Sequence, residues 1–364
     1  MTGIYIHIPF CIRKCPYCDF YSFSASEKDK DSYLKAVLCA LKTKRFLIDD
    51  KVDTVYFGGG TPSIFGAERI SQVISCIKDN YSLDEKAEIT VECNPSSVSQ
   101  KFFCELSHAG VNRISMGMQS AVERERKSLG RVSDKNQVKN AVEWAKKAGI
   151  DNISLDIMLG VPCQSVESLD ESIDFLLDSG IKHISAYMLK IEEGTPFHSV
   201  KDSLILPDDD LVSDMYLHTV KRLNEAGFYQ YEISNFSLSG YESKHNLKYW
   251  HCEEYLGIGP SAHSFIGGKR YYYKRDFDAF IKGEDMVYDC DGGDSEEYIM
   301  LALRLSEGLN FEKYKKRFGS EIDCSVIEKA KKFEKAGFLT ISREGIALKE
   351  SGFLISNMII AELL

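Results

Sequence analysis

The sequence has no excess of positive charge and no long apolar run. Its 45 Lys and Arg residues are outnumbered by 55 Asp and Glu residues, a formal net charge of −10, which argues against broad binding to nucleic-acid backbones. The most apolar stretch, GFLISNMIIAELL at the C-terminal end, is too short and too often interrupted by polar residues to span a bilayer. The first residues do not have the pattern of a secretory leader. We therefore expect a cytoplasmic protein that does not use nucleic acid as a partner.

The cysteine pattern does not suggest a disulfide framework. The chain has 11 cysteines, an odd number spread over 364 residues, which is typical of reduced thiols in a reducing compartment. Free cysteines are usually buried. We expect core positions for those that stand alone in apolar or helical contexts: Cys39, Cys76, Cys93, Cys104, Cys163, Cys290 and Cys324.

Short β-rich runs alternate with helical patterns over the first half of the chain. We expect strands at residues 4–8, 53–58, 88–93, 113–118, 152–159 and 183–189, and helices near 28–47, 66–80, 98–108, 134–148 and 167–179. Alternation of this kind predicts repeated βα units on a parallel sheet. Six such units predict an α/β fold built on a partial (βα)6 barrel of the TIM type.

The pattern changes after residue 195. A helix-like segment to about residue 226 is followed by an aromatic-rich region, residues 228–273. From residue 294, helix-like stretches precede GFLTI and GIAL, a pattern that resembles a small winged-helix module. Its mixed charges favour an interaction or scaffolding module over a DNA reader. We expect a barrel core at 1–195, an extension at 196–290 and a smaller winged-helix-like α+β domain at 291–364.

Three cysteines in YIHIPFCIRKCPYCDF, namely Cys11, Cys15 and Cys18, follow the first predicted strand with the spacing C-x3-C-x2-C. Thiols this close together suit a metal centre. Zinc would need a fourth ligand, such as His7 or Asp19, and usually takes two separated pairs of ligands, an arrangement not found here. A [4Fe–4S] cluster would bind the three thiolates on three irons and leave the fourth iron open.

A glycine-rich segment, YFGGGTPS, ends the second predicted strand. The three consecutive glycines, Gly58, Gly59 and Gly60, present bare backbone that a ligand can approach closely. Further polar residues lie at or beyond the C-terminal ends of predicted strands, where barrel active sites are built. Each alone could be an ordinary cap or turn residue, but together they predict one ligand site: Glu92, Gln119, Arg131 and Asp156.

The cysteine spacing, with Tyr17 before the third cysteine and Phe20 after it, resembles the radical S-adenosylmethionine (SAM) superfamily. In that superfamily SAM chelates the open iron of the cluster. Together with FGGGTPS, VECNP, SMGMQS, LGR and SLDIMLGVP, the motifs are similar to the oxygen-independent coproporphyrinogen III oxidase family over nearly the whole chain. The resemblance implies a [4Fe–4S] cluster on Cys11, Cys15 and Cys18. It also implies a SAM site lined by Tyr5, Gly59, Gly60, Thr61, Glu92, Gln119, Arg131, Asp156 and Ala186.

Two features depart from the oxidase and resemble the haem chaperones related to it. The oxidase has a further cysteine two residues after the third, where this chain has Phe20. HNLKYW, residues 245–250, resembles the H-N-x-x-Y-W haem-binding signature of those chaperones. The resemblance implies that His245 binds haem iron while Tyr249 and Trp250 pack on the macrocycle. His251 and Cys252 follow directly and are also able to ligate iron, so the axial ligand stays open.

Three functional hypotheses follow. In the first, the protein binds haem and passes it to an acceptor haemoprotein, the cluster and SAM control assembly or transfer, and no catalytic residue is assigned. In the second, it is the oxidase: a 5′-deoxyadenosyl radical from SAM abstracts hydrogen from the propionates of coproporphyrinogen III, and decarboxylation gives protoporphyrinogen IX. In the third, a radical SAM enzyme opens or alkylates the haem ring. Phe20 and HNLKYW favour the first hypothesis. The sequence leaves open the haem acceptor, an electron donor, SAM cleavage, peripheral membrane contact and whether the protein is a monomer or a homodimer.

Overall fold

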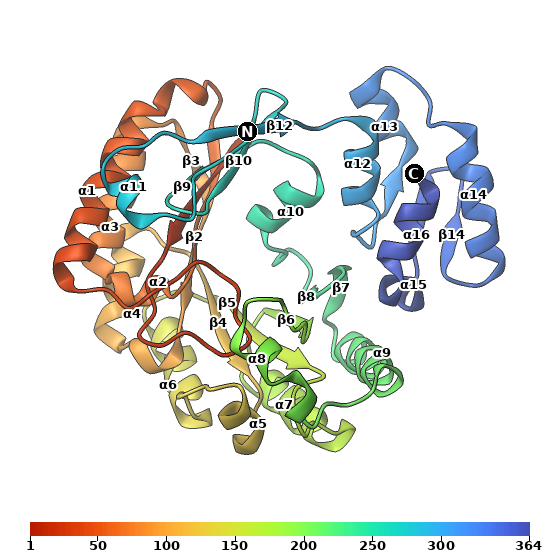
Figure 1. Ribbon diagram of the computed structural model, residues 1–364, viewed down its shortest axis with the longest axis horizontal. Helices are drawn as coiled ribbons and strands as arrows, with labels where there is room; N and C mark the ends of the chain where they lie inside the picture. Colours follow the sequence, from red (N-terminus) through yellow and green to blue (C-terminus); the bar gives the residue numbers. More distant parts are fainter.

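A computed structural model describes all residues, 1–364. Six parallel strands form the predicted partial barrel, in the spatial order of the sequence (Figure 1). The strands are β1 (Thr2–Ile8), β2 (Val52–Gly59), β3 (Leu83–Cys93), β4 (Arg113–Gln119), β5 (Asn152–Leu159) and β6 (His183–Met188). The helices outside them are α1 (Glu27–Thr43), α3 (Ala67–Asn80), α4 (Gln100–Ala109), α6 (Lys135–Lys147) and α7 (Val166–Asp178), with the short α2 (Pro62–Phe65) and α5 (Glu123–Ser128) in connecting loops. The barrel prediction is confirmed.

Local signals fix the ends of the barrel helices. Helix α1 begins with a capping box in which the Ser26 hydroxyl accepts from the Asp29 amide and the Asp29 carboxylate accepts from the Ser26 amide. Such a box satisfies two amides that have no partner inside the helix. Helix α4 ends at Gly110, whose φ of +105° is left-handed backbone that favours glycine. The chain therefore turns into each next strand where the sequence predicts it.

The barrel strands have one apolar and one polar face. In β4, Ile114 and Met116 are fully buried in the hydrophobic core, whereas Arg113 and Ser115 point to the barrel interior. Because parallel strands in register point equivalent residues to the same side, the neighbouring strands add further polar side chains to that interior: Thr54 and Tyr56 of β2, Glu88, Thr90 and Glu92 of β3, Ser154 and Asp156 of β5, and His183 and Ser185 of β6. The barrel therefore encloses a polar lumen.

The region after residue 195 extends the same sheet at both edges. The spatial order is β12-β11-β10-β9-β1 to β6-β8-β7, so the barrel strands form the middle of a 12-stranded sheet. The six added strands had not been predicted: β7 (Tyr229–Glu232), β8 (Asn235–Ser237), β9 (Tyr255–Ile258), β10 (His263–Ile266), β11 (Lys269–Tyr272) and β12 (Val287–Asp291). The helices of this region are α8 (Pro196–Ser199), α9 (Asp209–Glu225), α10 (Lys244–Trp250) and α11 (Phe277–Ile281).

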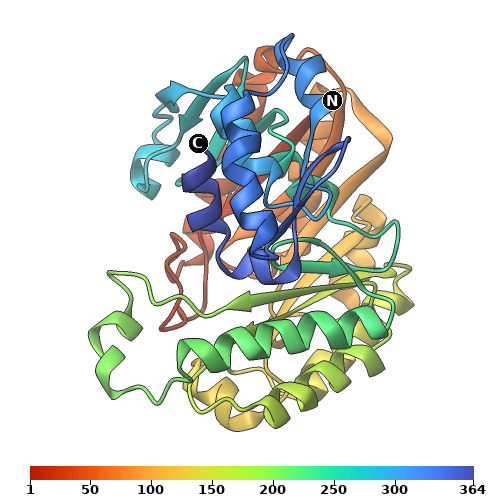
Figure 2. The same ribbon diagram turned by 90° about the vertical axis from the view of Figure 1, so that its right-hand side faces the viewer.

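The C-terminal module has its own three-stranded sheet, in the order β13-β15-β14. Helices precede and follow this sheet, and the module lies beside the barrel with α10 between the two (Figures 1 and 2). Its elements are α12 (Ser295–Ala302), β13 (Leu309–Asn310), α13 (Phe311–Phe318), α14 (Cys324–Lys335), β14 (Leu339–Ile341), β15 (Gly345–Leu348), α15 (Glu350–Leu354) and α16 (Ser356–Leu363). The predicted small α+β C-terminal part is confirmed. None of the helices combines the length and the apolar character needed to cross a membrane.

The prediction that the isolated cysteines are core residues is wrong for most of them. All eleven thiols are free, but Cys39, Cys163, Cys290 and Cys324 are exposed and Cys104 is half-buried. Only two of the set are buried, Cys76 on α3 and Cys93 at the end of β3. Apolar neighbours in sequence do not decide burial, because a residue's side of a helix or edge strand decides which way it faces.

Candidate functional site

The cysteine loop leaves the C-terminal end of β1 and lies next to the end of β2. All three thiols are partly exposed, and Cys11 Sγ lies 3.4 Å from Thr61 Oγ1. Burial raises the pKa of Cys18, and the neighbouring Cys15 and Cys11 thiols raise it further. The three thiols therefore share one electrostatic environment beside the glycine-rich turn. Phe20, which stands where the oxidase family has another cysteine, is 66% exposed.

The two residues considered as a fourth zinc ligand are engaged elsewhere. His7 is buried, with Nδ1 3.1 Å from the Tyr5 hydroxyl and Nε2 3.0 Å from the Tyr21 carbonyl oxygen. Asp19 lies 3.5 Å from Arg275 as an ion pair. No group of three or more His, Cys, Asp or Glu side chains is arranged to hold a metal ion. A [4Fe–4S] cluster takes each thiolate on a different iron, so it does not require the three sulfurs to converge on one point.

The glycine-rich turn is held by the strand beside it. The Gly60 amide donates to the Ile8 carbonyl at 2.8 Å and the Thr61 amide to the Phe10 carbonyl at 2.7 Å. A Cβ on Gly60 would lie 2.7 Å from the Phe10 carbonyl oxygen, which is closer than a Cβ approaches a non-bonded atom in real proteins. The sequence interpretation explained this glycine by the approach of a ligand, but contacts within the protein already require it. A large side chain at residue 60 would therefore disturb the base of the cysteine loop itself.

Gln119 and Arg131 meet at the end of β4. A Cβ added to Gly117 would lie 2.2 Å from Arg131 Nη2 and 2.6 Å from Gln119 Nε2, so both side chains crowd over this glycine. Gln119 Oε1 and Arg131 Nε are buried without a hydrogen-bond partner. Gln119 also has a φ of +71°, strained backbone of the kind that clusters at ligand sites. The unpaired polar atoms of Gln119 and Arg131 fit a polar ligand at this end of the barrel.

Two carboxylates lie on the lumen side of the same end. Glu92 accepts a 2.8 Å hydrogen bond from the Tyr56 hydroxyl, and burial raises the pKa of Glu92 to about 7. Burial also raises the pKa of Asp156, against hydrogen bonds from Ser185 and Ser115 and the attraction of two arginines. Each carboxylate raises the other's tendency to hold a proton. The pair suits a cationic ligand, which would favour the charged form of both.

Ala186 is the one predicted site residue whose side chain faces away. It pairs in register with Ile157, is 1% exposed and belongs to the hydrophobic core on the helix side of β6. Its amide donates to the Ser234 carbonyl at 2.8 Å. Its side chain is therefore not available to a ligand in the barrel interior. Most of the other SAM-site residues predicted from the resemblance lie at or near the C-terminal ends of β2 to β5, with Arg131 supplied by the loop after α5, whereas Tyr5 lies in the middle of β1.

The hexapeptide HNLKYW forms α10 and lies at the opposite end of the lumen. Glu88 of β3 caps this helix, because its two carboxylate oxygens accept the amides of Lys244 and His245 at 3.1 Å each. The Lys248 ammonium is 3% exposed and pairs with Asp53 at 2.8 Å. The helix that carries the haem-motif residues is therefore fixed to the N-terminal ends of β2 and β3.

His245 is enclosed in the barrel. Its ring is 1% exposed, with Nδ1 2.8 Å from Thr54 Oγ1 and Nε2 2.9 Å from the Tyr249 hydroxyl. The ring stacks on Tyr56 with centroids 5.2 Å apart and on Tyr5 at 6.3 Å. Burial lowers the pKa of His245 to about 3, so the imidazole is neutral. The neutral form is the one that ligates iron, but both ring nitrogens already have partners in this arrangement.

The residues at the end of α10 and just after it lie near residues 304–307. The Arg304 guanidinium lies 5.9 Å from the centre of the half-buried Trp250 ring. His251 is partly exposed, with Nε2 3.0 Å from Glu307. Cys252 is 3% exposed, with a φ of +53°. The alternative iron ligands thus lie in different surroundings, one at the surface and one in the core.

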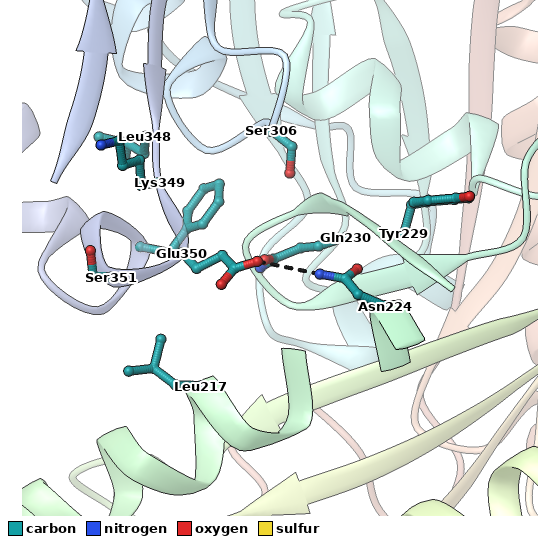
Figure 3. A pocket seen from close by; sticks show the side chains of 10 residues that line it. Leu217, Asn224, Tyr229, Gln230, Ser306, Leu348, Lys349, Glu350 and Ser351 are labelled. Carbon is teal, nitrogen blue, oxygen red and sulfur yellow. Dashed lines mark hydrogen bonds between the residues drawn. The ribbon is translucent and has the colours of Figure 1, made fainter. Parts of the chain in front are cut away.

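A cavity of about 750 Å³ lies elsewhere, between α9, β7 and the C-terminal module (Figure 3). Asn224 donates across it to Glu350 at 3.3 Å. None of the predicted site residues lines it. The residues around it are Leu217, Asn224, Tyr229, Gln230, Ser306, Leu348, Lys349, Glu350, Ser351 and Phe353.

Sequence reasoning missed several lumen residues that connect the two ends of the barrel. Thr54 and Tyr56 contact His245, Glu88 caps α10, and Arg113 is fully buried beside them. A signal was available: in E88-I-T-V-E92 and R113-I-S every second residue is polar although the strand is buried. Period-two polarity in a parallel sheet indicates a polar interior.

Known proteins similar to this chain indicate its family. Residues 5–176 match the radical SAM superfamily and residues 295–355 match the HemN C-terminal domain. The chain is 32% identical to the heme chaperone HemW of Lactococcus lactis, over 100% of this chain and 97% of that protein. It is also 32% identical to HemW of Bacillus subtilis, over 98% and 97%, and 38% identical to HemW of Escherichia coli, over 72% and 70%. The solved structure of coproporphyrinogen III oxidase (HemN) from Escherichia coli superposes with a TM-score of 0.85 at 19% identity, covering 100% of this chain and 89% of that one. At that identity the superposition shows a shared fold.

Proposed function

Because the chain belongs to the HemW family of heme chaperones, we propose that it binds haem and transfers it to acceptor haemoproteins. The observation that carries the proposal is the identity to these chaperones over the entire chain. The hexapeptide His245 to Trp250 supports it, as does Phe20 in place of a further cysteine. The eleven free cysteines support a cytoplasmic setting.

The radical SAM superfamily uses a [4Fe–4S] cluster and SAM. In our proposal Cys11, Cys15 and Cys18 hold the cluster, which supplies an open iron and an electron when it is bound. Thr61 lies against the cysteine loop, Gln119 and Arg131 offer unpaired polar atoms, and Glu92 and Asp156 supply negative charge. This set matches SAM, whose amino acid end needs donors and acceptors and whose sulfonium is positive.

In the proposed haem site, α10 presents His245, Tyr249 and Trp250. The neutral imidazole can bind iron, and the two aromatic rings can pack on the macrocycle. Iron can reach His245 only if the ring gives up its contact with Thr54 or Tyr249. Haem loading therefore involves a local rearrangement of α10, and His251 is the more accessible imidazole while α10 stays in place.

Reconstitution without oxygen separates the chaperone from the oxidase. We expect reconstituted protein to bind haem, seen as a Soret band that survives gel filtration. We expect no protoporphyrinogen above background from coproporphyrinogen III with SAM and a reductant. An oxygen-independent coproporphyrinogen III oxidase treated in the same way is the positive control. Decarboxylation over many turnovers, or no haem binding, would contradict the proposal.

The raised pKa of Glu92 predicts a pH dependence of SAM affinity. Glu92 titrates near pH 7, so it is negative above that pH and attracts the sulfonium, and it is neutral below it. We expect the dissociation constant of SAM to rise about tenfold from pH 8 to pH 6, measured by calorimetry with the cluster intact. The ligand's own amino group titrates too, so Glu92→Gln is the control: its profile should retain only the ligand's contribution. Equal profiles for the two proteins would remove Glu92 from the site.

A further inference from the structure

Arg113 is a buried cation without a direct partner. It is the first residue of β4, it is 1% exposed, and it forms no ion pair in the structure. Its Nε and Nη1 atoms are buried and make no hydrogen bond. Burying a charge without a partner is unfavourable. A buried, unpaired Arg113 is therefore expected to serve a function that outweighs this cost.

The neighbours of Arg113 place it in the middle of the polar lumen. It pairs in register with Thr90 of β3 and Asn152 of β5, and Thr90 Oγ1 and Asn152 Oδ1 are also buried without partners. On β3, Thr90 stands midway between Glu88 and Glu92. The guanidinium is therefore flanked on one strand by the carboxylate that caps α10 and by a carboxylate of the SAM site.

Neither of these carboxylates is paired with the arginine. Glu88 accepts the amides of α10, and Glu92 accepts the Tyr56 hydroxyl. A direct salt bridge would fix the guanidinium to one carboxylate and occupy its oxygens. An unpaired cation in a low-dielectric interior instead acts on all three carboxylates around it, Glu88, Glu92 and Asp156.

We propose that Arg113 is a positioning residue for the SAM site, the shared counter-charge that favours the ionised forms of Glu92 and Asp156 without occupying their oxygens in a salt bridge. The inference rests on the proposed SAM site and goes beyond it, because Arg113 does not itself touch the ligand. The same charge attracts Glu88 and so links the cap of α10 to the SAM end of the lumen.

The electrostatics of the lumen support this role. Arg113 lowers the pKa of Asp156 and of Glu92, although burial, the largest effect, raises both. It also lowers the pKa of His245 and thus helps to keep that imidazole neutral. The other titratable groups that interact with Glu92 are a carboxyl, four phenols and a thiol: Asp156 of β5, Tyr5 of β1, Tyr56 of β2, Tyr187 of β6, Tyr249 of α10 and Cys93 of β3.

The test compares Arg113→Met, which removes the charge, with Arg113→Lys, which keeps it. Both proteins are reconstituted with the cluster, and SAM affinity is measured by calorimetry from pH 6 to pH 9. In the methionine variant we expect the pH at which affinity is half-maximal to rise by about one unit, so that binding is about fivefold weaker at pH 7 and recovers near pH 9. The lysine variant should keep the wild-type midpoint.

Several outcomes would overturn the proposal. One is a methionine variant with the wild-type profile, and another is a loss of affinity that is equal at every pH, which would indicate a purely structural role. If Arg113→Met does not fold, a shifted midpoint in the folded lysine variant would equally contradict it. In the Glu92→Gln background the shift caused by Arg113→Met should shrink, since one of its two targets is gone. Wild-type protein that binds no SAM would instead reject the SAM site itself.

Discussion

Replacing Cys15 by Ala is expected to abolish the [4Fe–4S] cluster. The loop offers three thiols between residues 11 and 18 and no other His, Cys, Asp or Glu group arranged as a metal site. Two thiolates leave two irons of the cube without protein ligands. Iron and sulfide should fall from about four per chain to background after anaerobic reconstitution, and the electron paramagnetic resonance signal of the reduced cluster should disappear.

Cys39→Ala is the matched control for this experiment. Cys39 is an exposed free thiol on α1, so its loss should change neither the iron content nor the spectrum. Far-ultraviolet circular dichroism should show that Cys15→Ala keeps its fold, because the loop thiols are not part of the hydrophobic core. A full complement of iron and an unchanged spectrum in Cys15→Ala would reject the assignment.

The sequence predicted five of the six barrel strands to within two residues at each end, because each is long enough for its pattern to be read, whereas β3 begins at Leu83, five residues before its expected start. Strand β5, expected at 152–159, is Asn152–Leu159. The strands of the extension could not be read in the same way. Strand β8, Asn235–Ser237, has three residues, too few to establish a period of two. It forms by pairing with the edge of β6, a tertiary contact that the local sequence does not indicate.

Some features of the candidate site likewise follow from the local sequence, and others depend on tertiary contacts. From motifs at strand ends, Gln119, Arg131 and Glu92 were predicted to lie in one site, because parallel strands end on one side of a barrel. The reason for Gly60 could not be predicted, since its constraint comes from the carbonyls of Ile8 and Phe10 across a strand pair. The outward direction of Ala186 could have been predicted from its parity with Ile184 on the same strand.

The hexapeptide shows that a sequence motif does not by itself indicate whether its side chains are buried or exposed. From the sequence, His245 could be a haem ligand or an ordinary histidine, packed in the core or at the surface. The structure places it in the base of the barrel, held by Thr54 and Tyr249. His245 therefore has a structural role in this conformation, and it can ligate iron only in a second arrangement of its side chain.

The two roles of His245 can be separated with a pair of variants. We expect His245→Ala to lower the free energy of unfolding by about 2–4 kcal/mol, since it leaves a cavity and unpaired hydroxyls on Thr54 and Tyr249. We also expect it to erase the Soret band of bound haem if the imidazole ligates iron. Thr54→Val is the control: it removes the partner of Nδ1 and keeps the imidazole, so it should destabilise the protein by about 1–3 kcal/mol and retain haem.

The two roles of His245 are distinguished by measuring stability and haem binding for the same variants. If both variants lose haem in proportion to their loss of stability in urea, His245 acts only by holding α10 in place. The ligand would then be sought at His251, which is partly exposed beside Glu307, and His251→Ala should erase the Soret band without a comparable loss of stability. If only His245→Ala loses haem, the imidazole is the iron ligand. In that case Thr54→Val should bind haem at least as fast as wild type, because one of the two contacts that hold the ring inside the barrel has already been removed.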